Sequence, residues 1–155
     1  AIDLAEKEHK GLVISNGGQN FSAGANVGMI FMLAVEQDYD ELNFAVKTFQ
    51  DTMMRIRYSN VPVVVAPHNL TLGGGCELSM HADKVVAHAE SYIGLVEFGV
   101  GLIPGGGGSK EFAKRFSEGL TDGDIRINAL REKYQNHGTR GTRYCLRWCS
   151  LNGVW

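Results

Sequence analysis

The chain has 155 residues, of which 44% are hydrophobic and 21% charged, and its formal net charge at pH 7 is -2. This length and composition predict one globular domain with an apolar core. The charge does not favour nucleic acid or an anionic membrane as partner, and no apolar run is long enough to span a bilayer. The cysteines number three, an odd number, and we expect a cytoplasmic protein that has neither a signal peptide nor a disulfide framework.

The first third of the chain predicts a helix, a strand and a loop. Residues 1–7 predict the end of a helix that Gly11 stops, and residues 12–15 (LVIS) predict a short buried strand. Residues 16–26 (NGGQNFSAGAN) consist of turn formers and small residues, which predict a loop.

The clearest predicted helix covers residues 39–58, with Asp38 or Asp40 as its N-cap. Apolar residues recur along it at spacings of three and four, and we interpret this stripe as core packing. The stripe consists of Leu42, Ala45, Val46, Phe49, Met53 and Ile56.

A β-branched run bounded by prolines, residues 61–67 (VPVVVAP), predicts a buried strand. A turn at residues 68–71 then leads into three glycines and a short helix. Further on, residues 84–88 predict a strand and residues 92–97 an extended segment. The glycines of residues 104–108 (PGGGG) open another helix, whose predicted apolar face is Phe112, Ala113 and Phe116.

The sequence changes character near its C-terminal end. A last amphipathic helix is predicted for residues 124–134. Residues 136–155 contain both tryptophans and two of the three cysteines but no Asp or Glu, and they show no clear periodicity. We therefore interpret residues 1–135 as one partial domain and residues 136–155 as an atypical tail, out-of-frame or foreign to it.

The strongest chemical signal is the stretch of residues 72–78 (LGGGCEL). Three glycines let the backbone approach a ligand closely, and the helix that follows presents free N–H groups in its first turn. Glu77 lies on that turn. Backbone donors beside a carboxylate suit a reaction that passes through an oxyanion, because the donors stabilise negative charge while the carboxylate moves a proton.

Two other segments extend this pattern. Small residues around Ala25 allow its backbone N–H to approach a ligand, although this loop taken alone favours an ordinary strand-to-helix connection. Glu97, in the extended segment, supplies a second carboxylate. If Glu77 and Glu97 lie together, their repulsion disfavours double ionisation, so at least one pKa should be raised.

Four motifs in this order resemble the signatures of the enoyl-CoA hydratase/isomerase (crotonase) superfamily. They are residues 21–26 (FSAGAN), 72–78 (LGGGCEL), 94–97 (GLVE) and 103–108 (IPGGGG). The similarity is greatest to the hydratase part of multifunctional fatty-acid β-oxidation proteins and covers residues 1–135. It implies an α/β fold, a crotonase-like core of repeated βαβ units that is truncated at both ends.

The resemblance also implies roles for individual residues. It makes Glu77 and Glu97 the catalytic pair and places the oxyanion hole at the N–H groups of Ala25 and Gly74. It further implies that four positions bind substrate: Ala23, Gly24, Gly73 and Gly105. The expected partner is an acyl-CoA thioester, so the substrate carries coenzyme A and neither a separate cofactor nor a metal is expected. Two glutamates favour hydration of 2-enoyl-CoA, with isomerisation as a second activity.

The sequence departs from the family pattern at Asn69, where glycine is common; Asn tolerates a left-handed backbone, so the turn is expected to survive. A rival hypothesis is a non-catalytic folded remnant with a structural role or none. A phosphate-binding loop at residues 105–108 is disfavoured because no Gly-Lys-Ser/Thr follows, and Cys145 and Cys149 are weak evidence for zinc. Apolar faces without cover predict a homo-oligomer.

Overall fold

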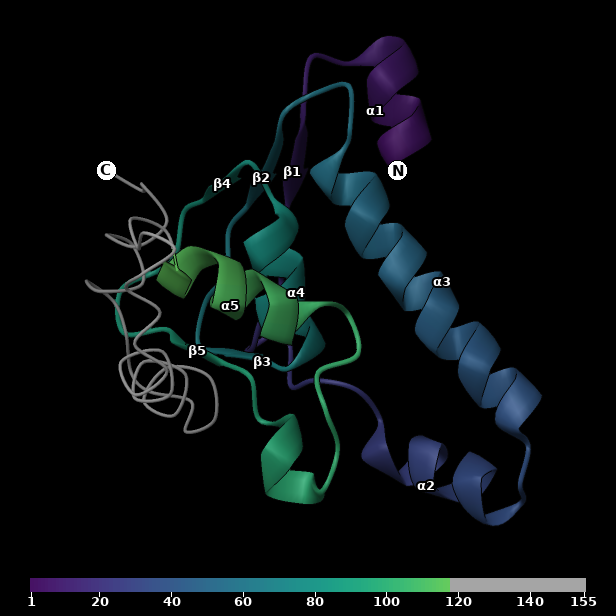
Figure 1. Cartoon of the computed structure of the whole chain (residues 1–155). Helices are drawn as coiled ribbons and strands as arrows, with labels where there is room; N and C mark the ends of the chain where they lie inside the picture. Colours follow the sequence, from purple (N-terminus) through teal and green to yellow (C-terminus); the bar gives the residue numbers. More distant parts are fainter. Residues whose placement is uncertain (118–155) are drawn as a thin grey trace.

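The computed structural model of the protein describes residues 1–117. The helix predicted at residues 124–134 and the tail at residues 136–155 lie outside the described residues. In chain order the elements are α1 (Ile2–Glu8), β1 (Leu12–Ile14), α2 (Val27–Val35), α3 (Tyr39–Arg57), β2 (Val63–Val65), β3 (Leu70–Leu72), α4 (Gly74–His81), β4 (Lys84–Val85), β5 (Tyr92–Gly94), the 3₁₀ helix η1 (Glu97–Val100) and α5 (Gly108–Ser117) (Figure 1).

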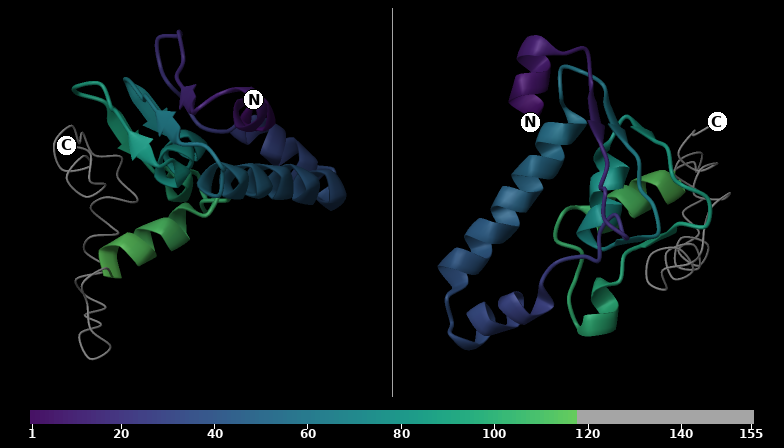
Figure 2. Two further views of the ribbon diagram at one scale, coloured as in Figure 1. Left: turned by 90° about the horizontal axis from the view of Figure 1, so that it is seen from above. Right: turned by 180° about the vertical axis from the view of Figure 1, so that it is seen from behind.

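The strands form two small parallel sheets. One has the order β1-β2-β4, and the other pairs β3 with β5. Helices α2 and α3 connect β1 to β2 in a βαβ crossover. Between β3 and its parallel partner β5 the chain passes through α4 and then through β4 of the first sheet. The predicted α/β fold of repeated βαβ units is therefore confirmed. The views in Figure 2 show the long helix α3 along one side, with the sheets beside α4.

Helix α4 is the most deeply buried helix among the described residues. Its buried residues are Gly75, Cys76, Glu77, Ser79, Met80 and His81. One core cluster joins α4 to the strands and α5 and consists of Cys76, Met80, Val85, Ile93, Leu95 and Phe112. A second cluster is centred on Met53, Ile56 and Val63 and fixes α3 against the first sheet. A short helix enclosed in this way holds its first turn in one place.

The predicted helix at residues 39–58 is confirmed as α3, and Asp38 is its cap, because the side chain of Asp38 accepts a hydrogen bond from the N–H of Glu41 at 3.2 Å. The interpretation of its apolar stripe as core packing is wrong for the first half of the helix. Met53 and Ile56 are buried, but Val46 is exposed, because residues 1–117 do not cover this face of α3.

Other expectations need correction as well. The strand at residues 12–15 is not buried throughout: Leu12 and Ile14 pack on the core, whereas Val13 points away from it and is 68% exposed. The strand at residues 84–88 is only the short β4. The turn at residues 68–71 gives way at Leu70 to β3, which the sequence did not predict. On α5, Phe112 is buried as expected, but Ala113 is exposed.

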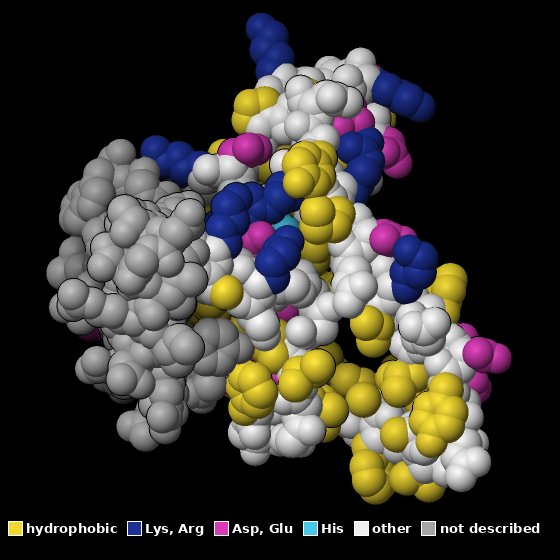
Figure 3. Space-filling model, in the orientation of Figure 1, with side chains coloured by type: hydrophobic (Ala, Val, Ile, Leu, Met, Phe, Trp, Pro, Cys, Tyr) yellow, Lys and Arg dark blue, Asp and Glu magenta, His cyan; other side chains and the backbone are white. Residues whose placement is uncertain are grey.

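Helix α2 was also not predicted from the sequence. Its residues (VGMIFMLAV) are apolar on every side, so they show no period, and none of them is buried. Figure 3 shows the resulting concentration of hydrophobic side chains at the end of the molecule where α2 lies. Within residues 1–117 no helix is both long and apolar enough to cross a membrane.

Candidate active site

The site is organised around the glycine turn between β3 and α4. The N–H of Gly73 donates to the carbonyl of Gly94 in β5 at 2.9 Å, which ties the turn to the neighbouring strand. Gly73 has a φ of 53° and a ψ of -119°, a conformation that a side chain would strain. A Cβ at Gly75 would lie 2.5 Å from the Cβ of Ser22, so only glycine fits there. The local geometry thus requires glycine at both positions.

The first predicted motif lies against this turn. Ser22 pairs with Thr71 in a parallel bridge, and the N–H of Leu72 donates to the carbonyl of Ser22 at 2.9 Å. Gly24 follows directly: its Cα is 3.7 Å from the position that a Cβ of Gly73 would take. Residues 22–25 and 73–75, about fifty positions apart in the sequence, are therefore neighbours in space.

Two backbone donors in this region have no hydrogen-bond acceptor among the described residues. Within residues 1–117, the N–H groups of Ala25 and Gly74 donate no hydrogen bond. Gly74 is the first residue of α4, where N–H groups have no acceptor inside the helix and point outward along its axis. Both donors can therefore bind a ligand atom that carries negative charge.

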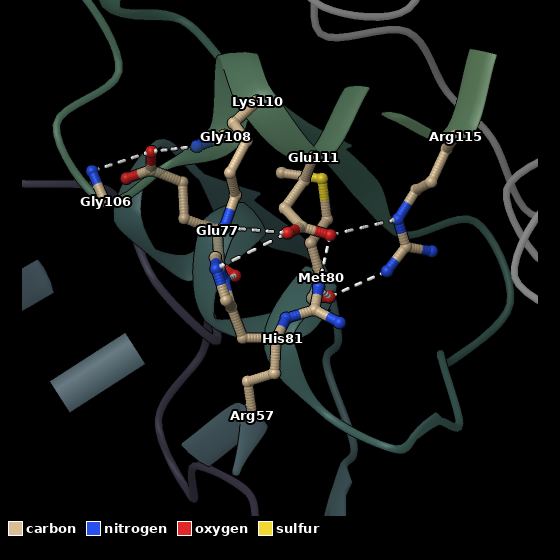
Figure 4. A network of polar contacts seen from close by, with 9 residues as sticks. All are labelled: Arg57, Glu77, Met80, His81, Gly106, Gly108, Lys110, Glu111 and Arg115. Carbon is tan, nitrogen blue, oxygen red and sulfur yellow. Dashed lines mark hydrogen bonds and ion pairs between the residues drawn. The ribbon is translucent and has the colours of Figure 1, made fainter. Parts of the chain in front are cut away.

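Glu77 lies in the first turn of α4, as predicted, and only 1% of its surface is exposed. Its Oε1 accepts two backbone hydrogen bonds, from the N–H of Gly106 at 2.9 Å and from the N–H of Gly108 at 2.8 Å (Figure 4). Gly108 begins α5, so the carboxylate of Glu77 also lies at the positive end of that helix.

The pKa of Glu77 is raised, as predicted for at least one of the two glutamates. Burial is the largest cause and the negative charge of Glu97 adds to it, while the hydrogen bonds from Gly108 and Gly106 act in the opposite direction. A carboxyl group with a raised pKa exchanges its proton more readily near neutral pH, which suits acid–base chemistry.

Glu97 is the second predicted carboxylate, and it approaches the glycine turn from the segment that follows β5. It does not lie on an extended segment as predicted: β5 ends at Gly94, and Glu97 opens η1. A Cβ at Gly73 would lie 3.0 Å from Oε1 of Glu97, and the other oxygen accepts the N–H of Val96 at 2.8 Å. The turn thus has Gly24 and Glu97 as direct neighbours.

Gly105 was predicted to bind substrate at a helix N-terminus. Helix α5 begins three residues later, at Gly108, and the carbonyl of Gly105 accepts a hydrogen bond from Gln50 at 2.8 Å. The residues that sequence reasoning missed are Gly106 and Gly108, which hold Glu77. The run of four glycines was the available signal, but it does not say which N–H groups face the carboxylate.

Asn69 adopts a φ of 46°, so the expectation that asparagine preserves the turn is confirmed. Its side chain also donates to the carbonyl of Gln19 at 2.6 Å, which fastens the turn to the loop before α2. Cys76 is buried, and burial raises the pKa of its thiol, as expected for a packed residue. Within residues 1–117 no three His, Cys, Asp or Glu side chains are grouped so as to hold a metal ion.

A second polar cluster surrounds Glu111, a residue of α5 that is only 2% exposed. Arg57 donates to its carboxylate, Nζ of Lys110 lies 3.1 Å away, Nε of Arg115 3.7 Å and Nε2 of His81 3.9 Å. Burial by itself raises the pKa of Glu111, but the hydrogen bond from Lys110 and the charge of Arg57 outweigh it, so the pKa is lowered. Burial lowers the pKa of His81. Figure 4 shows this cluster beside Glu77.

The fold is thus an α/β arrangement of βαβ units, with a glycine turn that lies against the carboxylate of Glu97 and precedes the buried Glu77 on α4. The chain belongs to the enoyl-CoA hydratase/isomerase family, whose sequence profile matches residues 3–122. A curated relative described as a probable 3-hydroxyacyl-CoA dehydrogenase from Bacillus subtilis (strain 168) is 52% identical over 134 residues, which is 86% of this chain and 17% of the relative. The fatty acid oxidation complex subunit alpha of Colwellia psychrerythraea is 33% identical over 66% of this chain and 14% of its own length.

Solved structures of enoyl-CoA hydratases are similar in fold to this chain. An enoyl-CoA hydratase from Thermoplasma volcanium has a TM-score of 0.71 and 27% identity, covering 98% of this chain and 55% of its own. An enoyl-CoA hydratase from Polaromonas sp. JS666 has a TM-score of 0.74 and 25% identity, covering 99% and 55%. The chain thus spans about half the length of these hydratases and less than a fifth of the curated relatives.

Proposed function

We propose that the chain acts on acyl-CoA thioesters as a hydratase, adding water to 2-enoyl-CoA through an oxyanion hole and two glutamates, with isomerisation as a second activity. The observation that carries the proposal is the position of Gly73. The backbone of Gly24 and the carboxylate of Glu97 both lie next to it, and Glu77 follows it one helical turn later on α4. These contacts support a site in which the proposed donors and acids surround the glycine turn.

The N–H groups of Ala25 and Gly74 are the proposed oxyanion hole. Addition at the β-carbon of an enoyl thioester moves electrons onto the thioester oxygen, and two N–H donors directed at that oxygen stabilise the resulting enolate. Loss of one such donor typically lowers the rate about a hundred- to a thousand-fold. Ala23, Gly24, Gly73 and Gly105 are proposed to line the thioester site, where small residues leave room for it.

The carboxyl groups of Glu77 and Glu97 are proposed to accept and donate the protons of the reaction. The oxygen of water bonds to the β-carbon, one proton of that water passes to the ionised carboxylate, and the enolate takes a proton at the α-carbon from the other, protonated carboxyl group. This scheme needs one charge on the pair at the start. Burial and the charge of Glu97 both raise the pKa of Glu77, which favours a pair with one protonated and one ionised carboxyl group. The substrate brings its own coenzyme A, so the scheme uses no further cofactor.

A crotonyl-CoA hydration assay tests the proposal, with the loss of absorbance of the conjugated thioester as its readout. The unmodified chain should turn the substrate over. Glu77→Gln and Glu97→Gln should each abolish most hydration and leave the fold intact, because the exchange is nearly isosteric. Glu8→Gln is the matched control, since Glu8 is exposed at the end of α1 and should not matter.

Exchange of the α-protons of butyryl-CoA with heavy water separates the two roles. It requires one base and the oxyanion donors but no attack by water, so it should survive one of the two glutamate changes. A chain that folds, binds butyryl-CoA and shows neither hydration nor exchange would instead support the rival hypothesis of a non-catalytic member of the family.

A further inference from the structure

Glu111 lies where three helices meet. It is in the first turn of α5, with its N–H bonded to the carbonyl of Gly107 at 3.0 Å. Arg57, which donates to its carboxylate, is the last residue of α3, and His81, whose Nε2 faces it, is the last residue of α4. A buried carboxylate of α5 that pairs with an arginine of α3 fixes these two helices relative to one another, because leaving either charge unpaired in the interior is costly.

The same cations also hold the C-terminal end of α4. The carbonyl oxygen of Met80 accepts hydrogen bonds from Nη2 of Arg115 at 2.7 Å and from Nη2 of Arg57 at 3.3 Å. Carbonyl groups at a helix C-terminus have no partner within the helix and attract positive charge. Arg57 and Arg115 therefore link Glu111 to α4 directly.

Helices α4 and α5 are consequently joined at two adjacent levels. Glu77 accepts the N–H groups of Gly106 and Gly108 at the start of α5, and one turn further along α4 the carbonyl of Met80 meets the cluster around Glu111. His81 connects the two levels, because its Nδ1 donates to the carbonyl of Glu77 at 2.7 Å. Figure 4 shows the two levels side by side.

We propose that Glu111 is a positioning residue for Glu77: by fastening α5 to Arg57 and to the end of α4, it keeps the N–H groups of Gly106 and Gly108 on Oε1 of Glu77. The catalytic consequence rests on the proposed function, whereas the positioning itself does not. Without the carboxylate, three neighbouring cations repel one another, α5 moves away from α4, and the two glycine N–H groups leave Glu77.

The test compares Glu111→Gln with the unmodified 155-residue chain. The matched control is Asp51→Asn, which removes an exposed carboxylate from the ion pair between Lys47 and Asp51 on α3. Hydrogen exchange by NMR, well below each melting temperature, should show exchange at the Gly106 and Gly108 amides accelerated about tenfold or more relative to the amide of Ile93 in β5. Titration of ¹³C-labelled glutamate, assigned with Glu77→Gln, should show a higher pKa for Glu77 in Glu111→Gln than in the unmodified chain. The reason is that the hydrogen bonds from Gly106 and Gly108, which lower this pKa, are lost in the variant.

Kinetics supply a second readout. In Glu111→Gln the kcat for crotonyl-CoA should fall about 10- to 100-fold, with KM changed less than about twofold, because a displaced catalytic group affects the chemical step. If Glu111→Gln does not fold, Arg57→Lys replaces it under the same criteria, since lysine keeps the charge but lacks the fork that reaches both Glu111 and Met80.

The outcomes are distinguishable. Equal acceleration of exchange at all amides, or an unchanged Glu77 titration in a folded variant, would overturn the positioning role and leave Glu111 as a purely structural residue. An unmodified chain without hydratase activity would refute the proposed function alone, because the exchange and titration experiments require no turnover.

Discussion

Alanine at position 106 places a methyl group in space that Phe49 and Glu77 already occupy. The new Cβ would lie 2.4 Å from Cε1 of Phe49 and 2.7 Å from Oε2 of Glu77, whereas ordinary contact begins at 3.4 Å. The ring or the glycine loop must therefore move by about 1 Å. Overpacking of this kind lowers the free energy of unfolding by about 1–3 kcal/mol, which corresponds to a fall in Tm of roughly 2–12 °C for a chain of this size.

Gly105→Ala is the matched control for stability, because no atom of the described part of the chain lies within 4 Å of its Cβ position and its φ is not positive. Its free energy of unfolding should change by less than about 1 kcal/mol. Thermal unfolding by circular dichroism measures both variants. In the crotonyl-CoA assay, displacement of Glu77 by about 1 Å should cost Gly106→Ala up to about 100-fold in rate. Wild-type Tm and wild-type hydration in Gly106→Ala would refute the packing of this loop on Glu77.

Burial lowers the pKa of His81 below its usual value of 6.5, so near that pH the unfolded chain binds a proton more readily than the folded chain. The folded state should therefore lose stability as the pH falls through about 6.5. Melting curves from about pH 8 to about pH 5 should show a smaller fall in Tm for His81→Gln than for the unmodified chain, and equal falls would contradict this account. Asn69→Ala loses a hydrogen bond and strains the backbone at a φ of 46°, costing about 2–3 kcal/mol, whereas Asn69→Gly should cost only about 1 kcal/mol. Urea unfolding compares the two, and equal costs would exclude backbone strain. The apolar side chains exposed on α2 predict a homo-oligomer, and a monomeric mass in light scattering of concentrated protein would show this prediction to be wrong.

Local sequence patterns were enough to predict the elements that depend on neighbouring residues. The cap at Asp38, the buried strand β2 between two prolines and the presence of a helix at the glycine run all follow from backbone preferences and apolar spacing. The start of that helix was predicted too late, because α4 begins at Gly74, inside the run and not after it. The motifs also predicted which glutamates and which N–H groups to consider. Glycine repeats, a carboxylate on a helix start and a left-handed turn at Asn69 each leave a trace within a few residues of sequence.

The tertiary structure decided what depends on distant partners. Val13 is exposed although it lies in an apolar run, and α2 has no buried residue although all of its side chains are apolar or small, because burial depends on what packs against a segment. The hydrogen bonds from Gly106 and Gly108 to Glu77 span 29 and 31 positions, and the pair of Arg57 and Glu111 spans 54. A sequence pattern records the local conformation of each residue, whereas these contacts arise only when the crossovers bring α3, α4 and α5 together.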